Sequence, residues 1–376
     1  MIDMSKSIRI LEVVNIMDRA GLETMLMNHY RHMDRALVQL DFLTHRPAAG
    51  AYDEEIRELG GRVFRAPRLY PQNCLAYRRY MRAFFAEHEY PVVHSHIDAM
   101  SVFPLAMARS CGVTVRVAHS HNDSVDRDVK YPVKEIARKR LPGIATHYWA
   151  CSEAAGAFLF GESNRQKIHV VKNAIDLSSF AFDSAARASA RVELGVTNGQ
   201  TVIGHVGRFG AVKNQAFLVN VLAVAIAGGE DAVLVFVGDG ELRGKVEQRA
   251  ASAGLSARVH FLGLRDDVAR LMQGFDVLVF PSLHEGIPLT LVEAQASGLP
   301  VLASDRVSSE ALVLPNCSQM ALSEPAAAWA AKACGMARVG RAEGCIEALS
   351  AAGYEINQSA RALQEIYLSL YEGTCR

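Results

Sequence analysis

The chain has 376 residues, half of them apolar, and its 40 lysines and arginines balance its 40 aspartates and glutamates. This length allows two domains with separate hydrophobic cores, and the composition excludes a disordered chain. The balanced charge argues against a nucleic-acid-binding protein, which usually carries a basic excess.

The seven cysteines form neither a CxxC pair nor an even framework, so we expect reduced thiols in a cytosolic protein. The first residues, MIDMSKSIRILEVV, lack the pattern of a signal peptide. No apolar run approaches the ~18 residues of a membrane span. We therefore expect a cytoplasmic protein that contacts a membrane, at most, peripherally at its inner face.

Short apolar runs that predict buried strands alternate with stretches of helical periodicity. In the first half we expect strands at 8–14, 36–43, 91–96, 113–120 and 146–152, and helices at 22–35, 73–88 and 101–111. In the second half we expect strands at 201–207, 232–238, 258–263, 276–282 and 300–305, and helices at 214–228, 241–253 and 286–298. This alternation predicts parallel sheets with helices on both faces, which bind ligands at the carboxyl ends of their strands.

The alternation restarts near residue 200, after a mixed segment at 173–200 that we interpret as a linker. We therefore expect two α/β domains, residues 1–175 and 176–354, that face each other across a cleft. The alanine-rich residues 321–352 are expected to be helical. The last helix, within 355–376, has apolar residues at helical spacing and must pack on another element.

The segment HEGIPLTLVEAQASGLPVLASD, residues 284–305, places Glu285 and Glu293 on either side of a Gly-Ile-Pro turn at a helix start. The free N–H groups of a helix start attract a phosphate, and Glu293 lies ~7–8 Å along the axis at ~1.5 Å per residue. A ligand could present a sugar to Glu285, a diphosphate to the amides and a ribose to Glu293. The alternative is a dipole contact for Glu285 and a surface position for Glu293.

A second candidate, GHVGRFGAVKNQAFLV at 204–219, has a strand that ends at Gly207, followed by Arg208, a small-residue loop and Lys213. Two cations at the carboxyl end of a strand can bind a diphosphate, the arginine through its fork and the lysine as a point charge. A solvated pair of charges is the alternative. However, this loop is expected at the same end of the sheet as Glu285.

Two further loops contain glycines that would let a ligand approach the backbone. Gly238 and Gly240 lie in VFVGDGELRGKVE, and Gly21 lies in MDRAGLETMLMNHYR after the first strand. Each loop could equally be an ordinary strand-to-helix turn. VFVGDG is not a GxGxxG with an acidic residue twenty positions on, so a nicotinamide site is not favoured.

Two HxH pairs, His94 with His96 and His119 with His121, end two strands of the first half. Both rings of such a pair lie on one face of the strand, but no third carboxylate or cysteine has a recognisable ligand spacing. We therefore expect no metal and interpret these histidines as polar residues that line the ligand-binding edge. The basic segment RDVKYPVKEIARKR, residues 127–140, predicts a solvated helix or, alternatively, a patch that contacts anionic lipid headgroups.

Together these motifs resemble those of the retaining, GT-B-fold glycosyltransferases of family 4, most closely the bacterial exopolysaccharide or capsule type. PSLHEGIPLTLVEAQASGLPVLASD is similar to the family's E-x7-E motif, VGRFGAVKN to its Arg…Lys diphosphate site, RAGLET to its first loop and RVAHSH to its histidine segment. The resemblance implies an α/β GT-B fold of two Rossmann-like, doubly wound parallel-sheet domains. The N-terminal domain would bind the acceptor and the C-terminal domain the donor, with the last helix crossing back to the first domain.

The resemblance also implies roles for individual residues. The catalytic candidates are Arg208, Lys213, Glu285 and His119, and the donor-binding candidates are Gly21, Gly207, Gly238, Gly286, Ile287, Pro288, Leu289 and Glu293. The two cations would stabilise the departing diphosphate, Glu285 would position the donor sugar, and His119 would lie beside it. Ala20 departs from the family pattern, because many members have a second glycine there.

The expected function is retaining, metal-independent transfer of a sugar from a nucleotide-diphosphate sugar, with a UDP-sugar as the expected donor, and no separate cofactor. The expected acceptor is a glycan or a lipid-linked oligosaccharide in surface polysaccharide synthesis, and an anionic membrane surface is a candidate partner. A sugar-nucleotide epimerase or hydrolase on the same fold, a non-catalytic sugar-nucleotide-binding subunit and a Rossmann dehydrogenase stay open as alternatives.

Overall fold

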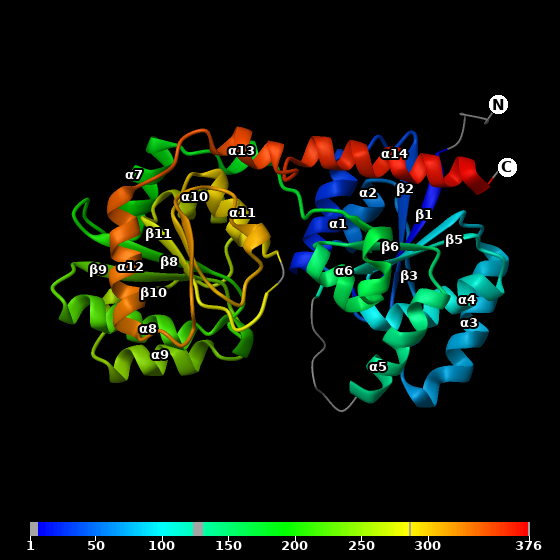
Figure 1. Cartoon of the computed structure of the whole chain (residues 1–376), viewed down its shortest axis with the longest axis horizontal. Coiled ribbons are helices and arrows are strands. Elements are labelled where there is room, and N and C mark those ends of the chain that lie inside the picture. The colour runs from blue at the N-terminus through cyan, green and yellow to red at the C-terminus, as the bar shows by residue number, and fades with distance from the viewer. Residues whose placement is uncertain (1–6, 123–130, 286, 375–376) are drawn as a thin grey trace. The chain divides into compact units, whose positions relative to one another are not determined.

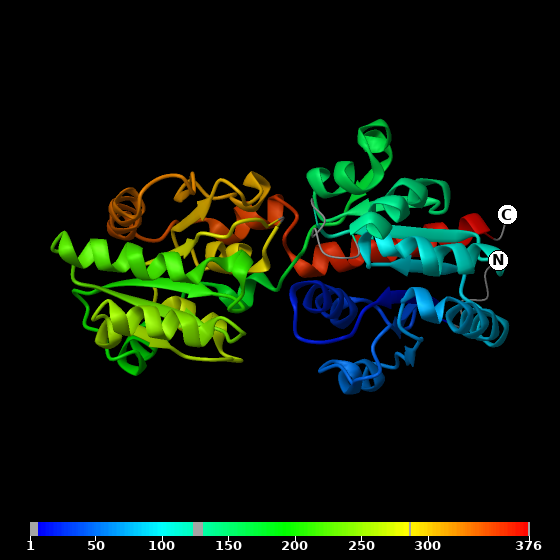
Figure 2. The ribbon, with the colours of Figure 1, turned by 90° about the horizontal axis from the view of Figure 1, so that it is seen from below.

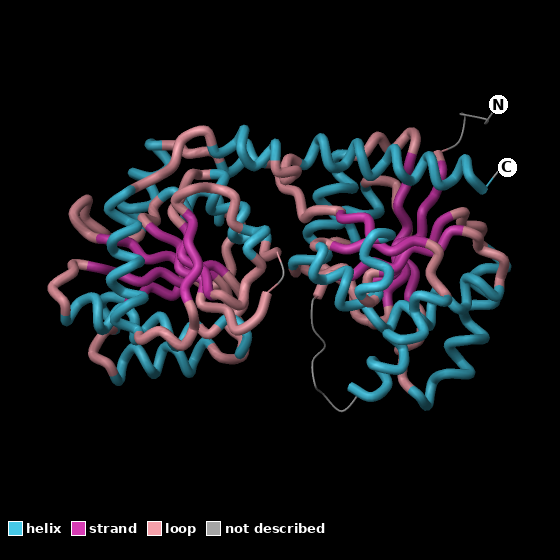
Figure 3. The backbone as a smooth tube through the Cα atoms, viewed as in Figure 1, coloured by secondary structure: helices cyan, strands magenta, loops and turns pink. Residues whose placement is uncertain are grey.

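The computed structural model describes residues 7–122, 131–285 and 287–374. These residues belong to two units, the first made of Met1–Ala174 and Ile356–Arg376 and the second of Ile175–Glu355. Each unit has a parallel sheet in its middle and helices on both faces of that sheet (Figures 1 and 2). The strands of each sheet are the magenta segments of Figure 3.

The first unit has a seven-stranded sheet in the order β3-β2-β1-β4-β5-β6-β7, and all its pairings are parallel. The strands are β1 (Ile8–Val14), β2 (Val38–Thr44), β3 (Val63–Arg65), β4 (Val92–Ser95), β5 (Val115–Ser120), β6 (His147–Ala150) and β7 (Ile168–Val170). The helices are α1 (Gly21–His32), α2 (Asp53–Glu58), α3 (Cys74–Glu87), α4 (Val102–Ser110), α5 (Tyr131–Arg140), α6 (Glu153–Phe160) and α14 (Ile356–Thr374).

Alternate residues of the first sheet enter two separate cores. Ile10 and Val14 of β1 pack with α1 and with Leu363 of α14, whereas Leu11 and Val13 pack on the opposite face with α3 and α4. This alternation follows from the two-residue period of a strand, and burial of both faces explains why the strand sequence is almost continuously apolar. The last helix therefore covers the same face of the first sheet as α1.

The second unit has a six-stranded sheet in the order β10-β9-β8-β11-β12-β13, again with parallel pairings throughout. The strands are β8 (Thr201–Val206), β9 (Ala232–Val237), β10 (Val259–Phe261), β11 (Val277–Phe280), β12 (Val301–Ser304) and β13 (Cys317–Met320). The helices are α7 (Ser184–Glu193), α8 (Gln215–Ala227), α9 (Arg243–Ser252), α10 (Val268–Gln273), α11 (Leu289–Ala296), α12 (Ala326–Val339) and α13 (Cys345–Ala351).

The second sheet also separates two cores. Val233 and Val235 of β9 pack in the core that contains α11, whereas Leu234 and Phe236 pack in the core that contains α8 and α12. The predicted fold class of doubly wound parallel sheets is confirmed. The sequence did not predict β3, β7 and β13, because these short edge strands contain no fully buried residue and therefore lack a clear apolar run.

Each sheet has a point at which the strand order reverses. In the first sheet β1 lies between β2 and β4, and in the second sheet β8 lies between β9 and β11. Loops that leave the carboxyl ends of such strands diverge to opposite faces, which leaves a crevice where open α/β sheets bind ligands. The loops that follow β1 and β4, and those that follow β8 and β11, are therefore the candidate ligand-binding loops.

Candidate functional site

The loops after β8 and β11 lie side by side at the carboxyl edge of the second sheet. Leu283 donates its backbone N–H to Val212 at 2.7 Å, and the side-chain amide of Asn214 donates to Pro281 at 3.3 Å. These bonds follow from the pairing of β8 with β11, which starts both loops from neighbouring positions. Two segments that are distant in sequence thus form one surface.

Two predicted site residues meet on this surface. The Nζ atom of Lys213 lies 2.7 Å from Oε1 of Glu285, and the two side chains are 21% and 20% exposed. The same ammonium lies 4.5 Å from the ring centroid of Phe280, within cation–π range. An ammonium has three donors, so Lys213 can keep this ion pair and still donate to a ligand.

Arg208 lies on the same loop, directly after Gly207, and it is exposed. Its backbone carbonyl accepts a hydrogen bond from Gln215 at 2.9 Å. Within residues 7–122, 131–285 and 287–374, no side-chain partner neutralises its guanidinium. Arg208 is therefore a cation available to an anionic ligand, whereas the charge of Lys213 is balanced by Glu285.

The backbone around Glu285 is held by the loop after β12. Glu285 donates to the carbonyl of Arg306, and its own carbonyl accepts from Ser308, both at 3.2 Å. Ile287 is buried, and Pro288 directly precedes α11, whose first residue is Leu289. Gly286, a predicted donor-binding residue, lies outside the described residues. The start of α11 thus follows Glu285 closely, as the sequence predicted.

Glu293 lies in the interior of α11 and is partly buried. Burial disfavours the charged carboxylate and raises the pKa of Glu293 to about 7. The residue therefore changes its charge near neutral pH. A hydroxyl donor placed beside it would favour the ionised form and pull the pKa down again.

The predicted glycines differ in the space that a Cβ atom would have at each position. A Cβ atom at Gly238, whose φ is +131°, would lie 2.3 Å from the carbonyl oxygen of Gly207, so the close approach of two strand ends already explains Gly238. A Cβ at Gly207 would make only ordinary contacts, 3.5 Å from Cε of Lys213. At Gly21, the first residue of α1, a Cβ would meet no described atom within 4 Å, which leaves space for a ligand.

Sequence reasoning missed two buried polar residues beside this surface, His205 and Ser282. Nδ1 of His205 bonds the carbonyl of Val279 at 2.9 Å, while its Nε2 and the Ser282 hydroxyl have no hydrogen-bond partner in the described part of the chain. Burial lowers the pKa of His205 to about 4, so the ring is neutral. The apolar strand pattern around His205 gave no signal of it.

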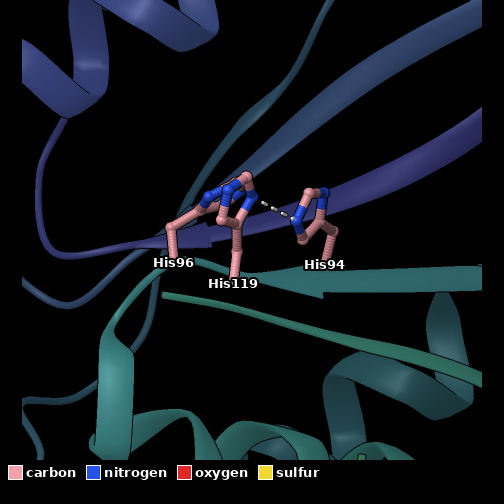
Figure 4. A group of neighbouring side chains, drawn as sticks. All are labelled: His94, His96 and His119. Carbon is pink, nitrogen blue, oxygen red and sulfur yellow. Dashed lines mark hydrogen bonds between the residues drawn. The ribbon is translucent and has the colours of Figure 1, made fainter. Parts of the chain in front are cut away.

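A cluster of histidines lies at the carboxyl ends of β4 and β5 in the first unit (Figure 4). Nε2 of His94 lies 3.1 Å from Nδ1 of His119, and Nδ1 of His96 lies 2.9 Å from Nε2 of His121. Glu12 of β1, which the sequence analysis did not select, is fully buried beside them, and its Oε2 lies 2.7 Å from Nε2 of His96. All five side chains lie on the face that α14 covers.

Ligand atoms of His94, His96 and His119 lie within 4.8 Å of one another, so a metal must be considered. The rings of His94 and His119 are nearly parallel, at 5°, with centroids 5.2 Å apart, while their facing nitrogens are 3.1 Å apart. The nitrogens therefore point at each other edge to edge, as in a hydrogen bond, rather than at a common third point. We interpret the cluster as a hydrogen-bonded network, and the expectation of no metal stays a prediction.

His119, predicted to lie beside the reacting sugar, is only 1% exposed, and its Nε2 has no partner among the described residues. His121 is partly exposed, and its backbone N–H donates to Asp98 at 3.0 Å. Asp98 has a φ of +45°, a left-handed conformation that is uncommon for a residue other than glycine. A strained turn after β4 thus holds the segment after β5.

Comparison with known proteins places this geometry in a family. A model of "Glycosyltransferase Family 4" matches residues 19–179, and a model of "Glycosyl transferases group 1" matches residues 200–338. EpsF of Bacillus subtilis (strain 168), a protein named as a glycosyltransferase, is 41% identical over 96% of this chain and 96% of its own length. The chain belongs to glycosyltransferase family 4.

More distant relatives carry more specific names. An Escherichia coli UDP-Gal:alpha-D-GlcNAc-diphosphoundecaprenol alpha-1,3-galactosyltransferase is 28% identical over 60% of each chain. The structure of Anabaena HepE in complex with UDP-glucose superposes with a TM-score of 0.76 at 21% identity, covering 96% of this chain and 99% of HepE. WaaG, a glycosyltransferase of lipopolysaccharide biosynthesis, has a TM-score of 0.67 at 16% identity and covers 97% and 98%. The fold of this family 4 glycosyltransferase is therefore GT-B.

In the part of this glycosyltransferase that the structure describes, no helix combines the length and the hydropathy needed to cross a bilayer.

Proposed function

We propose that this family 4 glycosyltransferase transfers a sugar, with retention, from a UDP-sugar to a glycan or lipid-linked acceptor in surface polysaccharide synthesis. The observation that carries the proposal lies at the point where the strand order of the second sheet reverses. There Lys213 forms an ion pair with Glu285, and the loop of Lys213 also contains Arg208, whose charge is not neutralised by a described side chain. UDP-glucose in HepE and UDP-galactose in the name of the Escherichia coli relative support the choice of donor.

The proposed reaction breaks the bond between the anomeric carbon and the diphosphate. Negative charge then grows on the leaving oxygen, where the Arg208 guanidinium and the Lys213 ammonium stabilise it in preorganised positions. Glu285 accepts a hydrogen bond from a hydroxyl of the donor sugar and orients it, and Glu293 accepts from the ribose. The acceptor oxygen attacks from the face that the diphosphate leaves, and its proton passes to the departing phosphate oxygen.

In this proposal the two cations supply the positive charge that a divalent metal supplies elsewhere, so no metal is required. The predicted glycine Gly207 gives the donor access to the backbone, and the amides after Glu285 add donors for the diphosphate. The predicted donor-binding role of Gly21 stays a prediction. The role of His119 beside the sugar stays a prediction.

A donor screen tests the proposal. UDP-, GDP- and ADP-sugars are compared by thermal shift, and we expect stabilisation with a UDP-sugar to exceed that with the others, because a ligand stabilises only the state that binds it. Product analysis with the stabilising donor follows. Free sugar or an isomerised donor that forms without any acceptor, as fast as the donor is consumed when an acceptor is present, would favour the hydrolase or epimerase alternative. Donor binding with no transfer to any glycan or lipid-linked acceptor would favour a non-catalytic subunit.

The affinity for UDP is expected to rise with pH through the region near pH 7. The ionised form of Glu293 accepts the ribose hydroxyls, and burial places the pKa of this carboxyl at about 7, so binding is weaker below that value and stronger above it. Calorimetric titration of UDP at several pH values measures the slope. In the matched variant Glu293→Gln the charge is absent, and a slope as steep as that of the wild type would contradict the role of Glu293.

Helix α5 is the proposed site of contact with an anionic membrane. Val133 and Ile136 are 44% and 54% exposed, and Lys139 and Arg140 are nearby cations on the same helix. Apolar side chains among cations are typical of helices that lie on a membrane surface. Residues 127–130 of the predicted basic segment lie outside the described residues.

We expect the purified chain to be retained on vesicles that contain anionic lipid and to be released at high salt. The double substitution Val133→Asp with Ile136→Asp is expected to abolish retention in a flotation assay. Val192→Asp, at a valine of the second unit that is more exposed than either residue, is the control and should leave retention unchanged. Equal retention of all three proteins would show that α5 is not the contact.

A further inference from the structure

Glu12 is the centre of the buried network in the first unit. The Tyr367 hydroxyl of α14 donates to Oε1 of Glu12 at 2.8 Å, and Oε2 lies 2.7 Å from Nε2 of His96. Beyond His96 the chain of hydrogen bonds continues to Nε2 of His121 at 2.9 Å. The opposite nitrogen of His121, Nδ1, has no hydrogen-bond partner among the described residues, and the side chain is partly exposed. Glu12, His96 and His121 thus form the first branch of the network, and Nδ1 of His121 is the nitrogen of this branch that can bond a ligand.

The histidines of this branch are neutral, because burial lowers the pKa of His96 to about 3 and holds that of His121 well below its ordinary value. A neutral imidazole carries one proton, so a hydrogen bond at one nitrogen fixes the role of the other. If Glu12 is ionised, His96 donates to it from Nε2 and accepts at Nδ1 from Nε2–H of His121. Nδ1 of His121 is then bare.

If Glu12 is protonated, both hydrogen bonds reverse. The carboxyl donates to Nε2 of His96, Nδ1–H of His96 donates to Nε2 of His121, and Nδ1 of His121 carries a hydrogen. The change from the protonated to the ionised state moves one proton along each bond and releases one proton at Nδ1 of His121. No other atom changes its bonding.

Both states are within reach near neutral pH. Burial raises the pKa of Glu12 to about 8, while the hydrogen bond from Tyr367 opposes that rise. The titratable groups around Glu12 are Tyr367 from α14, His94 and His96 from β4, His119 and His121 from β5 and the segment after it, and His29 from α1. Among the described residues, no lysine or arginine forms an ion pair with Glu12.

We propose that Glu12 is a positioning residue that selects, through His96, whether Nδ1 of His121 accepts or donates a hydrogen bond to a sugar hydroxyl, and that Tyr367 of the last helix holds Glu12 in place. The identity of the ligand as a sugar rests on the proposed function. The coupling between Glu12 and His121 does not, because it is a property of the free chain.

The second branch of the network, formed by Tyr367, His94 and His119, provides an internal control for the change expected at His121. Tyr367 donates to Glu12 in both states, so its oxygen accepts from Nδ1–H of His94, at 2.7 Å. Nε2 of His94 then accepts from Nδ1–H of His119, and Nε2 of His119 is bare in both states. The protonation pattern of His119 is therefore expected to stay constant while that of His121 inverts.

The test is a titration of the full chain labelled with ¹⁵N-histidine, followed by ring-nitrogen NMR between about pH 6 and about pH 9.5, a range that brackets the expected midpoint. We expect the protonated nitrogen of His121 to change from Nδ1 to Nε2 with a midpoint near pH 8, with His119 unchanged. A constant pattern for His121 would overturn the proposal. So would stoichiometric metal in the purified chain, because a metal would occupy the same nitrogens.

Three variants sharpen the result. Glu12→Gln replaces the carboxyl proton by an amide hydrogen, so His121 should keep its low-pH pattern throughout the range. Tyr367→Phe removes the donor that opposes protonation of Glu12, so the midpoint should move upward. Ser359→Ala is the matched control, because it removes another hydroxyl of α14 that lies 2.9 Å from a buried histidine, His29, outside the network. A midpoint that moves equally in Ser359→Ala and Tyr367→Phe would show that loosening of α14 is the cause.

Activity gives a separate readout. Glu12→Gln should flatten the upper limb of the pH profile of kcat/KM and retain the fold. If the NMR inversion holds but no sugar transfer is found, only the proposed function fails. If transfer is found but Glu12→Gln and the wild type have the same pH profile and the same His121 pattern, only the role of Glu12 fails.

Discussion

The double substitution Arg208→Ala with Lys213→Ala is expected to lower kcat by about 10³-fold or more and to leave the fold intact. Loss of one preorganised donor at a developing charge typically costs ~10²–10³ in kcat, and the two losses need not add because in the proposed reaction both groups act on one diphosphate. Thermal unfolding should change little, since Arg208 is exposed and neither side chain belongs to a core. Initial rates with saturating donor and acceptor measure the effect.

Lys245→Ala is the control for charge removal, because Lys245 is an exposed cation of α9 in the same unit. It should retain full activity. A double variant at 208 and 213 that turns over as fast as the wild type would remove the basis for the proposed chemistry.

The second large effect is expected from exchanging the members of the ion pair. Lys213→Glu with Glu285→Lys keeps a salt bridge at the same place, between side chains that are 21% and 20% exposed in the wild type. The exchanged pair should therefore unfold at nearly the wild-type temperature. Activity should nevertheless fall by about 10²-fold or more, because a carboxylate replaces the cation that stabilises the leaving group in the proposed reaction.

The single variants Lys213→Glu and Glu285→Lys complete this cycle. Each places two like charges next to each other, so each should be less stable than the exchanged pair. Recovery of activity as well as stability in the exchanged pair would mean that the ion pair has only a structural role. Recovery of stability alone is the expected outcome.

The central strands could be predicted because they are buried on both faces. IRILEVV marks β1 without error in its bounds, and the apolar runs of β8 and β9 are equally clear. Edge strands such as Val63–Arg65 and β13 have no fully buried residue, so no apolar run marks them in the sequence. The fold class therefore follows from the sequence, whereas the number of strands per sheet does not.

The sequence also predicted that the loops of Lys213 and Glu285 would lie at the same sheet edge, and the contact at 2.7 Å agrees with that expectation. It did not predict Glu12 as a functional residue, because a single acidic residue within an apolar strand gives no local signal of a role. The partners of Glu12 come from β4, whose register places His94 directly opposite it, and from Tyr367 near the end of the chain. Such long-range partners have no signature in local periodicity.

The membership of α14 in the first unit has a consequence for biosynthesis. The second unit is one continuous stretch, Ile175–Glu355, so its folding requires no residues from elsewhere in the chain. Most of the first unit is translated before the second unit, yet the face of its sheet that carries Ile10 and Glu12 waits for Leu363 and Tyr367, which are translated after the second unit. During synthesis this face stays uncovered until α14 has emerged, so the nascent first unit is the stage at which chaperones are expected to bind.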